Sequence, residues 1–268
     1  MTSPSPIALR VAGLSQALEL HVHDARDRYV SRRIREEGIW EPYETELLLG
    51  MLQPGDVMVD VGANIGYFSV IAAAQVGEAG AVVAFEPDPR NCELLRRNVT
   101  HNGLAARVEI VEAGLAATDA PGDLYLSEDN FGDHQIFAAD DTRDSVPVTL
   151  LHGASYLQSR VQRIDLLKVD TQGAEFAVMS GLMPLLAGLP APPRILIELT
   201  PLSLREYGAS GRALVELLAT LAQPMWIVDH IEHRLAPSTA EELARWCDNV
   251  DGWNGDRGFM NILVGPAP

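Results

Sequence analysis

The chain has 268 residues and carries 37 acidic against 20 basic side chains, a formal net charge of −17 at pH 7. This length is enough to bury a sizeable core, and a hydrophobic content of 47% is ordinary for a globular protein. A surface this negative repels phosphate backbones, which counts against nucleic acid as a partner. It tolerates neutral molecules and favours cationic ones. Alternatively, the excess of acidic side chains merely keeps the protein in solution.

The cysteines and the apolar segments predict the compartment. Cys92 and Cys247 lie far apart and form no CxxC pair. No secretory apolar region is seen at the start, and no stretch approaches the ~18 uninterrupted apolar residues that a membrane span needs. We therefore expect a reduced, cytoplasmic protein with no membrane partner.

Residues 1–50 predict a leader that precedes a regular alternating pattern. The segments "ALRVAG" and "ALELHVH" indicate two short strands, and a helix is expected over about residues 26–38. The leader is placed as a separate segment, so that residues 51–268 form the ligand-binding domain.

From Pro54 onward, apolar runs of strand length alternate with longer helical patterns. Strands that alternate with helices predict right-handed crossovers and a mostly parallel sheet covered on both faces, hence the α/β class with a Rossmann-like architecture. Seven strands are expected, within the runs "VMVDVG", "AVVAFEP", "RVEIVEAG", "DLLKVDTQG", "RILIELTP", "PMWIVDH" and "FMNILVG".

One stretch, about residues 122–151, breaks this alternation. The segments "GDLYLSEDNFGDHQIF" and "SVPVTLLH" indicate two short strands around a polar loop. They predict a hairpin-like insertion in the domain.

The turn after the first of the seven strands, "DVGANIG", predicts a ligand site, because ligands in such sheets bind at the carboxyl ends of the strands. Gly62 lets the backbone approach a ligand, and Gly66 allows a helix to pack closely on a strand. The dinucleotide pattern G-x-G-x-x-G is absent because Asn64 occupies its second glycine position, and no P-loop Gly-Lys-Ser/Thr follows. Asp60 disfavours a phosphate and suits an ammonium or sulfonium group.

Glu86 ends the second strand of the pattern. An acid at this point can accept both hydroxyls of a ribose. Alternatively, Asp60 caps the next helix and Glu86 is a solvated edge residue. Together, the two acids at neighbouring strand ends indicate an adenosine ligand without a pyrophosphate.

Three segments resemble one family in order and spacing: "DVGANIGYFS", "FEPDPRNCELLRRNVTHNG" and "LLKVDTQGAEFAVMSG". They are similar to the FkbM-type methyltransferases, a branch of the class I enzymes that use S-adenosylmethionine. The resemblance covers about residues 39–201, and "IWEP" matches the entry segment of the family. The chain departs at Thr171 and Gln172, where an apolar residue and Glu are expected, in a turn assigned to the active site.

The resemblance implies that the glycine turn holds the amino-acid end of S-adenosylmethionine. Gly62 and Asn64 then line it, and Asp60 fixes the loop or reaches the ammonium group through water. Glu86 binds the ribose, and Gly114 lies near the adenine. The implied cofactor-binding set is Asp60, Gly62, Asn64, Gly66, Glu86, Gly114 and Asp170.

The end of the fourth strand is where the resemblance places the methyl group. Asp170 is then the residue nearest the chemistry, and Lys168 on the same strand face pairs with an acid. An N-cap role for Asp170, before a helix that starts near Gly173, is the alternative and is compatible.

A hydroxyl acceptor must also lose a proton. His134 in "DNFGDHQ" is the candidate base, because the insertion is expected to project over the mouth of the pocket. Its neighbours Asp129 and Asp133 favour the protonated ring, which makes it a less ready base, and a solvated loop histidine is the alternative.

A metal is a second way to acidify a hydroxyl. Asp170 and Glu198 are expected at neighbouring strand ends, with Asp229 and His230 after the next, and such oxygens suit Mg²⁺. Acids at strand ends are also common without metal. His230 and His233 have a spacing seen among metal ligands, but no further motif supports zinc.

Three functions remain open. The first is O-methyl transfer to a small molecule or sugar, with an amine-bearing acceptor favoured by the negative surface. The second is methylation of nucleic acid, and the third is a non-catalytic adenosine-binding module. For the first, the aromatic residues Tyr29, Trp40 and Tyr43 and the loop 128–135 are expected to form a lid over the acceptor. Alternatively, the aromatic residues of the leader simply cover one edge of the sheet. The oligomeric state does not follow from the sequence.

Overall fold

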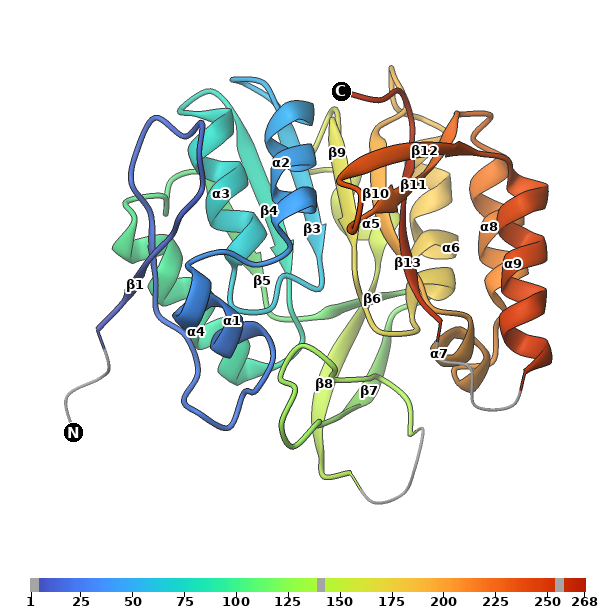
Figure 1. The fold of residues 1–268 in the computed structure, drawn as a ribbon, viewed down its shortest axis with the longest axis horizontal. Helices are drawn as coiled ribbons and strands as arrows, with labels where there is room; N and C mark the ends of the chain where they lie inside the picture. The colour runs from blue at the N-terminus through green and yellow to red at the C-terminus, as the bar shows by residue number, and fades with distance from the viewer. Residues whose placement is uncertain (1–4, 139–142, 254–257) are drawn as a thin grey trace.

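The computed structural model describes residues 5–138, 143–253 and 258–268 of the chain (Figure 1). A central sheet of eight strands, with helices on both faces, dominates it. The strands from β10 to β5 in the sheet order are mutually parallel, whereas β13 and β12 run antiparallel to their neighbours. In sheet order the strands are β12 (Arg234–Ser238), β11 (Met225–Asp229), β13 (Met260–Val264), β10 (Arg194–Leu199), β9 (Leu166–Val169), β3 (Val57–Val61), β4 (Ala81–Phe85) and β5 (Val108–Val111).

The α/β class, the mostly parallel sheet and all seven expected strands are confirmed. The count of seven was wrong, because a hairpin after β11 adds the edge strand β12. Its sequence, "RLAPS", has no buried residue and contains Pro237, which a strand at the edge of a sheet tolerates. Without an apolar run, this strand gives no periodic signal in the sequence.

Side chains of the central strands alternate between two cores. In β4, Val82 and Ala84 face one core, and Val83 and Phe85 face the other. The first core is covered by α2 (Pro42–Met51), α3 (Tyr67–Val76) and α4 (Pro89–His101). The second is covered by α5 (Gly153–Leu157), α6 (Glu175–Leu186), α7 (Pro201–Glu206), α8 (Gly211–Ala219) and α9 (Ala240–Gly252).

The leader contains two short strands, β1 (Ile7–Ala8) and β2 (Glu19–Leu20), which pair antiparallel. β2 lies within the expected segment "ALELHVH", whereas β1 meets the expected "ALRVAG" only at Ala8. The expected helix is α1 (Val30–Glu37). Leu18, Leu20 and Ile34 of the leader join the first core, so the leader packs directly on the sheet domain. The division of the chain after residue 50 stays a prediction.

The insertion forms a separate three-stranded sheet, seen below the main sheet in Figure 1. Its hairpin is confirmed: β7 (Ala120–Tyr125) and β8 (Ser145–His152) pair antiparallel. A third strand, β6 (Gly114–Ala116), pairs parallel with β8 and leads into the insertion from the main sheet. Within the described residues, no helix is long and apolar enough to cross a membrane.

Helix α6 connects the two sheets by packing against β6. A Cβ atom on Gly181 of α6 would lie 2.2 Å from the carbonyl oxygen of Ala116. No side chain fits in this contact, so a glycine is needed here although it lies inside a helix.

We therefore expect Gly181→Ala to destabilise the fold by ~1–3 kcal/mol, the usual cost of overpacking. The control is Gly252→Ala in α9, where an added Cβ would meet nothing within 4 Å; it is expected to leave stability unchanged or slightly raised, because Ala favours helix over Gly. The midpoints of urea unfolding measure both. Equal midpoints for the two variants would contradict the close packing of α6 on β6.

Candidate active site

The sheet changes direction between β3 and β9. From β3 the chain continues to β4 and β5 on one side, and from β9 to β10 on the other. Ligands of such sheets bind at the carboxyl ends of the strands beside this point. Two cavities meet there, and both are lined by Gly62, Asn64, Gly132, Asp170 and Gln172.

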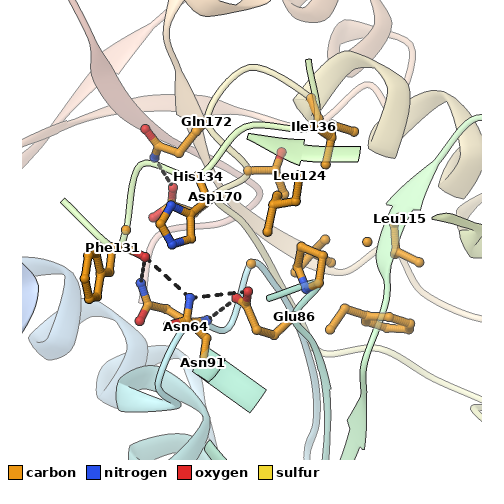
Figure 2. A pocket seen from close by; sticks show the side chains of 18 residues that line it. Asn64, Glu86, Asn91, Leu115, Leu124, Phe131, His134, Ile136, Asp170 and Gln172 are labelled. Carbon is orange, nitrogen blue, oxygen red and sulfur yellow. Dashed lines mark hydrogen bonds between the residues drawn. The ribbon is translucent and has the colours of Figure 1, made fainter. Parts of the chain in front are cut away.

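The inner cavity lies over the ends of β3 and β4 and has a volume of about 550 Å³ (Figure 2). Glu86 gives it one polar side, and much of the rest of its wall is apolar. The apolar lining includes Phe85, Leu115, Leu124 and Ile136.

The outer cavity is the larger, at about 2040 Å³ including space open to solvent. Side chains of the leader, of the insertion and of the segment after β10 line it. Among them are Tyr29, Trp40, Glu41, Gln135, Glu198 and Phe259.

The glycine turn is held close to the end of β9. Gly62 has a φ of +87°, and a Cβ at this position would lie 1.8 Å from the carbonyl oxygen of Asp170. The backbone N–H groups of Gly62 and Ala63 both donate to the carbonyl of Phe85, at 2.9 Å. Gly62 is therefore required by the approach of two strand ends, besides lining both cavities.

Gly66 has a different contact from the one expected. It was expected to bring a helix onto a strand, but a Cβ here would lie 2.3 Å from Cδ1 of Leu95 in α4. It thus brings α3 onto α4, and it is not among the residues that line the cavities.

Glu86 lies in the inner cavity, as the sequence predicted for a ribose-binding acid. The backbone N–H groups of Asn64 and Asp88 donate to its carboxylate at 2.7 and 2.8 Å, and Nδ2 of Asn91 does so at 3.4 Å. Burial raises the pKa of Glu86 to about 7, although these hydrogen bonds favour the ionised form. The side chain is therefore fixed in place and titrates near neutrality.

Asp60 does not line either cavity. Its side chain faces the first core, where it accepts a hydrogen bond from Ser69 of α3 at 2.5 Å, and burial raises its pKa. It pairs in register with Lys168 across β3 and β9. This contact fixes the start of α3; a contact with a cofactor stays a prediction.

Gly114 begins β6 and lines the inner cavity, next to Leu115. An added Cβ would lie 2.9 Å from Cδ2 of Leu150. The glycine therefore lets β8 of the insertion approach the cavity wall.

His134 also lines the inner cavity, but both of its ring nitrogens are engaged. Nδ1 accepts from the backbone N–H of Ser127 at 3.0 Å, so Nε2 carries the proton in the neutral ring and donates to Asp88 at 3.1 Å. Arg90 also approaches Nε2, at 3.4 Å. The sequence-based assignment of His134 as general base is therefore not supported by this arrangement, in which the ring ties the insertion to the start of α4.

The acidic neighbours expected around His134 have other partners. Asp129 pairs with Arg28 at 3.6 Å, and Asp133 pairs with Arg143 at 2.9 Å. Asp88, which the sequence did not single out, is the acid at the ring. Its pKa lies well below the ordinary value, because hydrogen bonds from His134 and the Arg90 side chain outweigh the opposing effect of its own burial.

Asp170 lies where the two cavities meet. Its Oδ2 accepts from Lys168 Nζ at 3.1 Å, which confirms the expected pairing of Lys168 with an acid. Its Oδ1 accepts from the amide of Gln172 at 2.7 Å, and the same amide donates to Glu198 at 3.1 Å. A glutamate at position 172 would replace this donor with a third acid.

A metal site is not formed by the expected residues. Gln172 separates Asp170 from Glu198, and the carboxylate of Asp229 accepts the backbone N–H groups of Ile231 and Glu232. Within residues 5–138, 143–253 and 258–268, no three His, Cys, Asp or Glu side chains group as metal ligands. The hypothesis of Mg²⁺ at these strand ends is not supported.

Two residues of the site were missed in the sequence. The side-chain amide of Asn91 donates to the carboxylate of Glu86 and to the carbonyl of Phe131, each at 3.4 Å. Glu41 lines the outer cavity in a left-handed conformation, with a φ of 42°. Both stand in segments that resemble the family, Glu41 in "IWEP" and Asn91 in "FEPDPRNCELLRRNVTHNG", but neither residue indicates a specific chemistry by itself. Pro42, which starts α2, follows Glu41.

The family model that matches the chain, and the relatives named below, are methyltransferases. The family model described as "Methyltransferase FkbM domain" matches residues 60–219. Methyltransferase 1 of Beauveria bassiana is 27% identical in a match that covers 47% of this chain and 57% of that protein. The 31-O-demethyl-FK506 methyltransferase FkbM of Streptomyces tacrolimicus is 27% identical over 60% of this chain and 70% of its own length.

Among solved structures, the precorrin-6y C5,15-methyltransferase of Geobacter metallireducens GS-15 superposes with a TM-score of 0.48 at 13% identity, over 91% of this chain and 96% of its own. At this score and identity the assignment rests on the sequence match, whose range includes the glycine turn, Glu86 and Asp170. The chain is therefore a member of the FkbM family of S-adenosylmethionine-dependent methyltransferases.

Proposed function

We propose that this protein transfers a methyl group from S-adenosylmethionine to a hydroxyl oxygen of a small molecule or sugar. The observation that carries the proposal is the junction of two unlike cavities at Asp170 and Gln172. One is the smaller and has mainly apolar walls with the buried acid Glu86, and the other is wider and lined by many polar and charged side chains. A cofactor in the first and an acceptor in the second would meet at this junction.

The residues of the inner cavity fit the cofactor. Glu86 is held by donors on its flanks, and its carboxylate lines the cavity, which suits the two hydroxyls of a ribose. Leu115, Leu124 and Ile136 give the apolar walls that an adenine needs. When bound, S-adenosylmethionine supplies a methyl group on a sulfonium centre, and the chain's own residues orient the acceptor towards it.

The outer cavity supports a hydroxylated acceptor. Tyr29 and Trp40 of the leader and Gln135 of the insertion line it, as the lid hypothesis requires. Tyr43 differs from that hypothesis, because its ring stacks on His233 at 5.4 Å and is not among the lining residues. The Streptomyces relative is named for methylation at an oxygen, which favours the same atom here.

The charges of the outer cavity favour an amine-bearing acceptor, such as an amino sugar. Its lining has an excess of acids over bases, which attracts a cation more than an anion. The acids are Glu41, Asp133, Asp170, Glu198 and Glu206, and the bases are Arg143 and Lys168.

The first prediction concerns cofactor binding and pH. An ionised Glu86 accepts ribose hydroxyls and a protonated one does so less well, so affinity for S-adenosylhomocysteine is expected to fall as the pH drops below about 7, the pKa of the free carboxyl. Linkage limits the fall to about tenfold per pH unit. Titration calorimetry between pH 5.5 and 8 measures it.

The control is Glu86→Gln, which has nearly the same shape and does not titrate. It should bind S-adenosylhomocysteine more weakly at pH 8, with little dependence on pH. Equal pH dependence in both proteins would remove Glu86 from the ribose role.

The second prediction concerns turnover. Asp170→Asn weakens the hold on Lys168 at the junction, and misplacement of an acceptor there is expected to lower methyl transfer by ~10²-fold. S-adenosylhomocysteine affinity should change only a few-fold. Asp123→Asn, an exposed acid on β7, is the control and should retain full turnover.

Turnover is measured as transfer of a labelled methyl group from S-adenosylmethionine to a panel of phenols, polyols, sugars, amino sugars and RNA. Label on an oxygen of one of the small molecules supports the proposal. Label in RNA alone, or undiminished transfer by Asp170→Asn, contradicts it.

A further inference from the structure

Two glutamates stand beside the outer cavity and have no assigned role. Glu41 directly precedes α2 and lines the cavity, and Glu44 lies in the first turn of α2, 1% exposed. Glu41 has a φ of 42° and is followed by Pro42, a combination that is strained for a side chain of this kind. The fold therefore holds Glu41 at the cavity in a conformation it would not adopt by itself.

The two carboxyl groups lie within hydrogen-bonding reach of each other. One oxygen of each, Oε2, is buried, and among the described residues neither has a hydrogen-bond donor. The other oxygen of Glu44 accepts from the amide of Asn261. Two carboxylates this close do not both ionise, so a proton between them is the remaining partner for both oxygens.

The charged groups around the pair leave this proton in place. Lys168 of β9 is the neighbouring cation, but its ammonium group donates to Asp170 at 3.1 Å and lies 4.5 Å from the centre of the Phe68 ring. Tyr67 of α3 and Asp170 of β9 face Glu41, and His230 after β11 faces Glu44. Burial first, and then the charge of Glu44, raises the pKa of Glu41 well above its ordinary value.

Asp170 has less capacity to take a proton than this pair. Both of its oxygens already accept hydrogen bonds, from Lys168 and from Gln172. Glu198 is another acid of this cavity whose pKa burial raises, but its carboxylate already accepts from the amide of Gln172 at 3.1 Å. His134 is engaged at both nitrogens, and Glu41 is the lining acid with a buried carboxylate oxygen that has no donor among the described residues.

We propose that Glu41 and Glu44 share one proton at rest and that this pair removes the hydroxyl proton of the acceptor. As the acceptor oxygen bonds to the methyl carbon, the carbon–sulfur bond breaks and its electron pair stays on sulfur. The O–H proton passes to the ionised member of the pair, so that both glutamates are protonated. This inference rests on the proposed function, since it uses the same acceptor cavity.

A route for the proton to leave the pair runs away from the cavity. Nε2 of His230 lies 3.8 Å from Oε1 of Glu44 and 3.3 Å from the amide of Asn261. The His230 side chain is 32% exposed, so its ring reaches solvent. A histidine between a buried acid and water can pass a proton from one to the other.

The test is a pH titration of the glutamate carboxyl carbons by NMR, on protein labelled with ¹³C at that position and assigned through the backbone. In the wild type, one proton of the pair should remain bound at pH 7. In Glu44→Gln, Glu41 should ionise at lower pH than in the wild type, because its repelling partner is gone. Glu46→Gln, on the exposed side of α2, is the control and should change neither signal.

The proposal is overturned if Glu41 and Glu44 of the wild type both ionise near the ordinary glutamate pKa of about 4.3. The wild-type titration decides this even if a variant fails to fold. S-adenosylhomocysteine binding by calorimetry separates the two claims. A protein that binds it while both glutamates are ionised at pH 7 retains the proposed function and loses the proton-sharing pair; a protein that does not bind it loses the proposed function whatever the carboxyls show.

A kinetic measurement follows with whichever panel compound accepts the methyl group. Glu41→Gln should lower kcat by ~10²-fold or more, the scale of a general base, and leave S-adenosylhomocysteine affinity within a few-fold. A wild-type kcat in Glu41→Gln would contradict the role of the pair as base.

Discussion

The ammonium group of Lys168 is buried at the carboxyl end of β9, and the site is built around it. Lys168 pairs in register with Asp60 of β3, and its Nζ meets Asp170 at the strand end. Burial alone would lower the pKa of Lys168, but the nearby carboxylates of Asp170, Glu44 and Glu41 raise it above its ordinary value. A buried charge costs several kcal/mol unless it is paired, so this lysine requires acids at the first core and at the junction of the cavities.

The need of Lys168 for these acids links three segments of the chain. Glu41 and Glu44 come from the end of the leader, Asp60 from β3, and Asp170 from the end of β9, across the switch point. Removing the lysine would leave several carboxylates close together in a low-dielectric region. The leader therefore does more than cover an edge of the sheet, because it brings acids to the face that carries Lys168.

Much of this arrangement follows from the sequence. β3, β4 and β9 are largely apolar runs in which almost every residue is buried, and "DVGANIG" takes a positive φ at Gly62, Asn64 and Gly66, residue types that tolerate it, so the fold and the place of the site are predictable. The place of Glu86 at the inner cavity is predictable because it ends the second strand. The lysine–acid pairing follows from the two-residue period of a strand, which puts Lys168 and Asp170 on one face.

The remainder depends on contacts between distant segments. His134 was assigned as a base from its loop, yet its partners are Ser127, seven residues away, and Asp88, in another element. Glu41 became part of the site only through the left-handed turn before Pro42. Strand β12, with no apolar run, forms because β11 offers it an edge. No local pattern contains this information.

The central claim is that one end of the sheet holds cofactor and acceptor in adjoining cavities that meet at Asp170. A crystal structure of the complex with S-adenosylhomocysteine tests it most directly. The account predicts ribose hydroxyls within hydrogen-bonding distance of Glu86, the adenine between Leu115 and Ile136, and the sulfur atom beside Asp170, facing the outer cavity. A nucleoside bound away from Glu86, or a sulfur atom enclosed with no opening to the outer cavity, would contradict it.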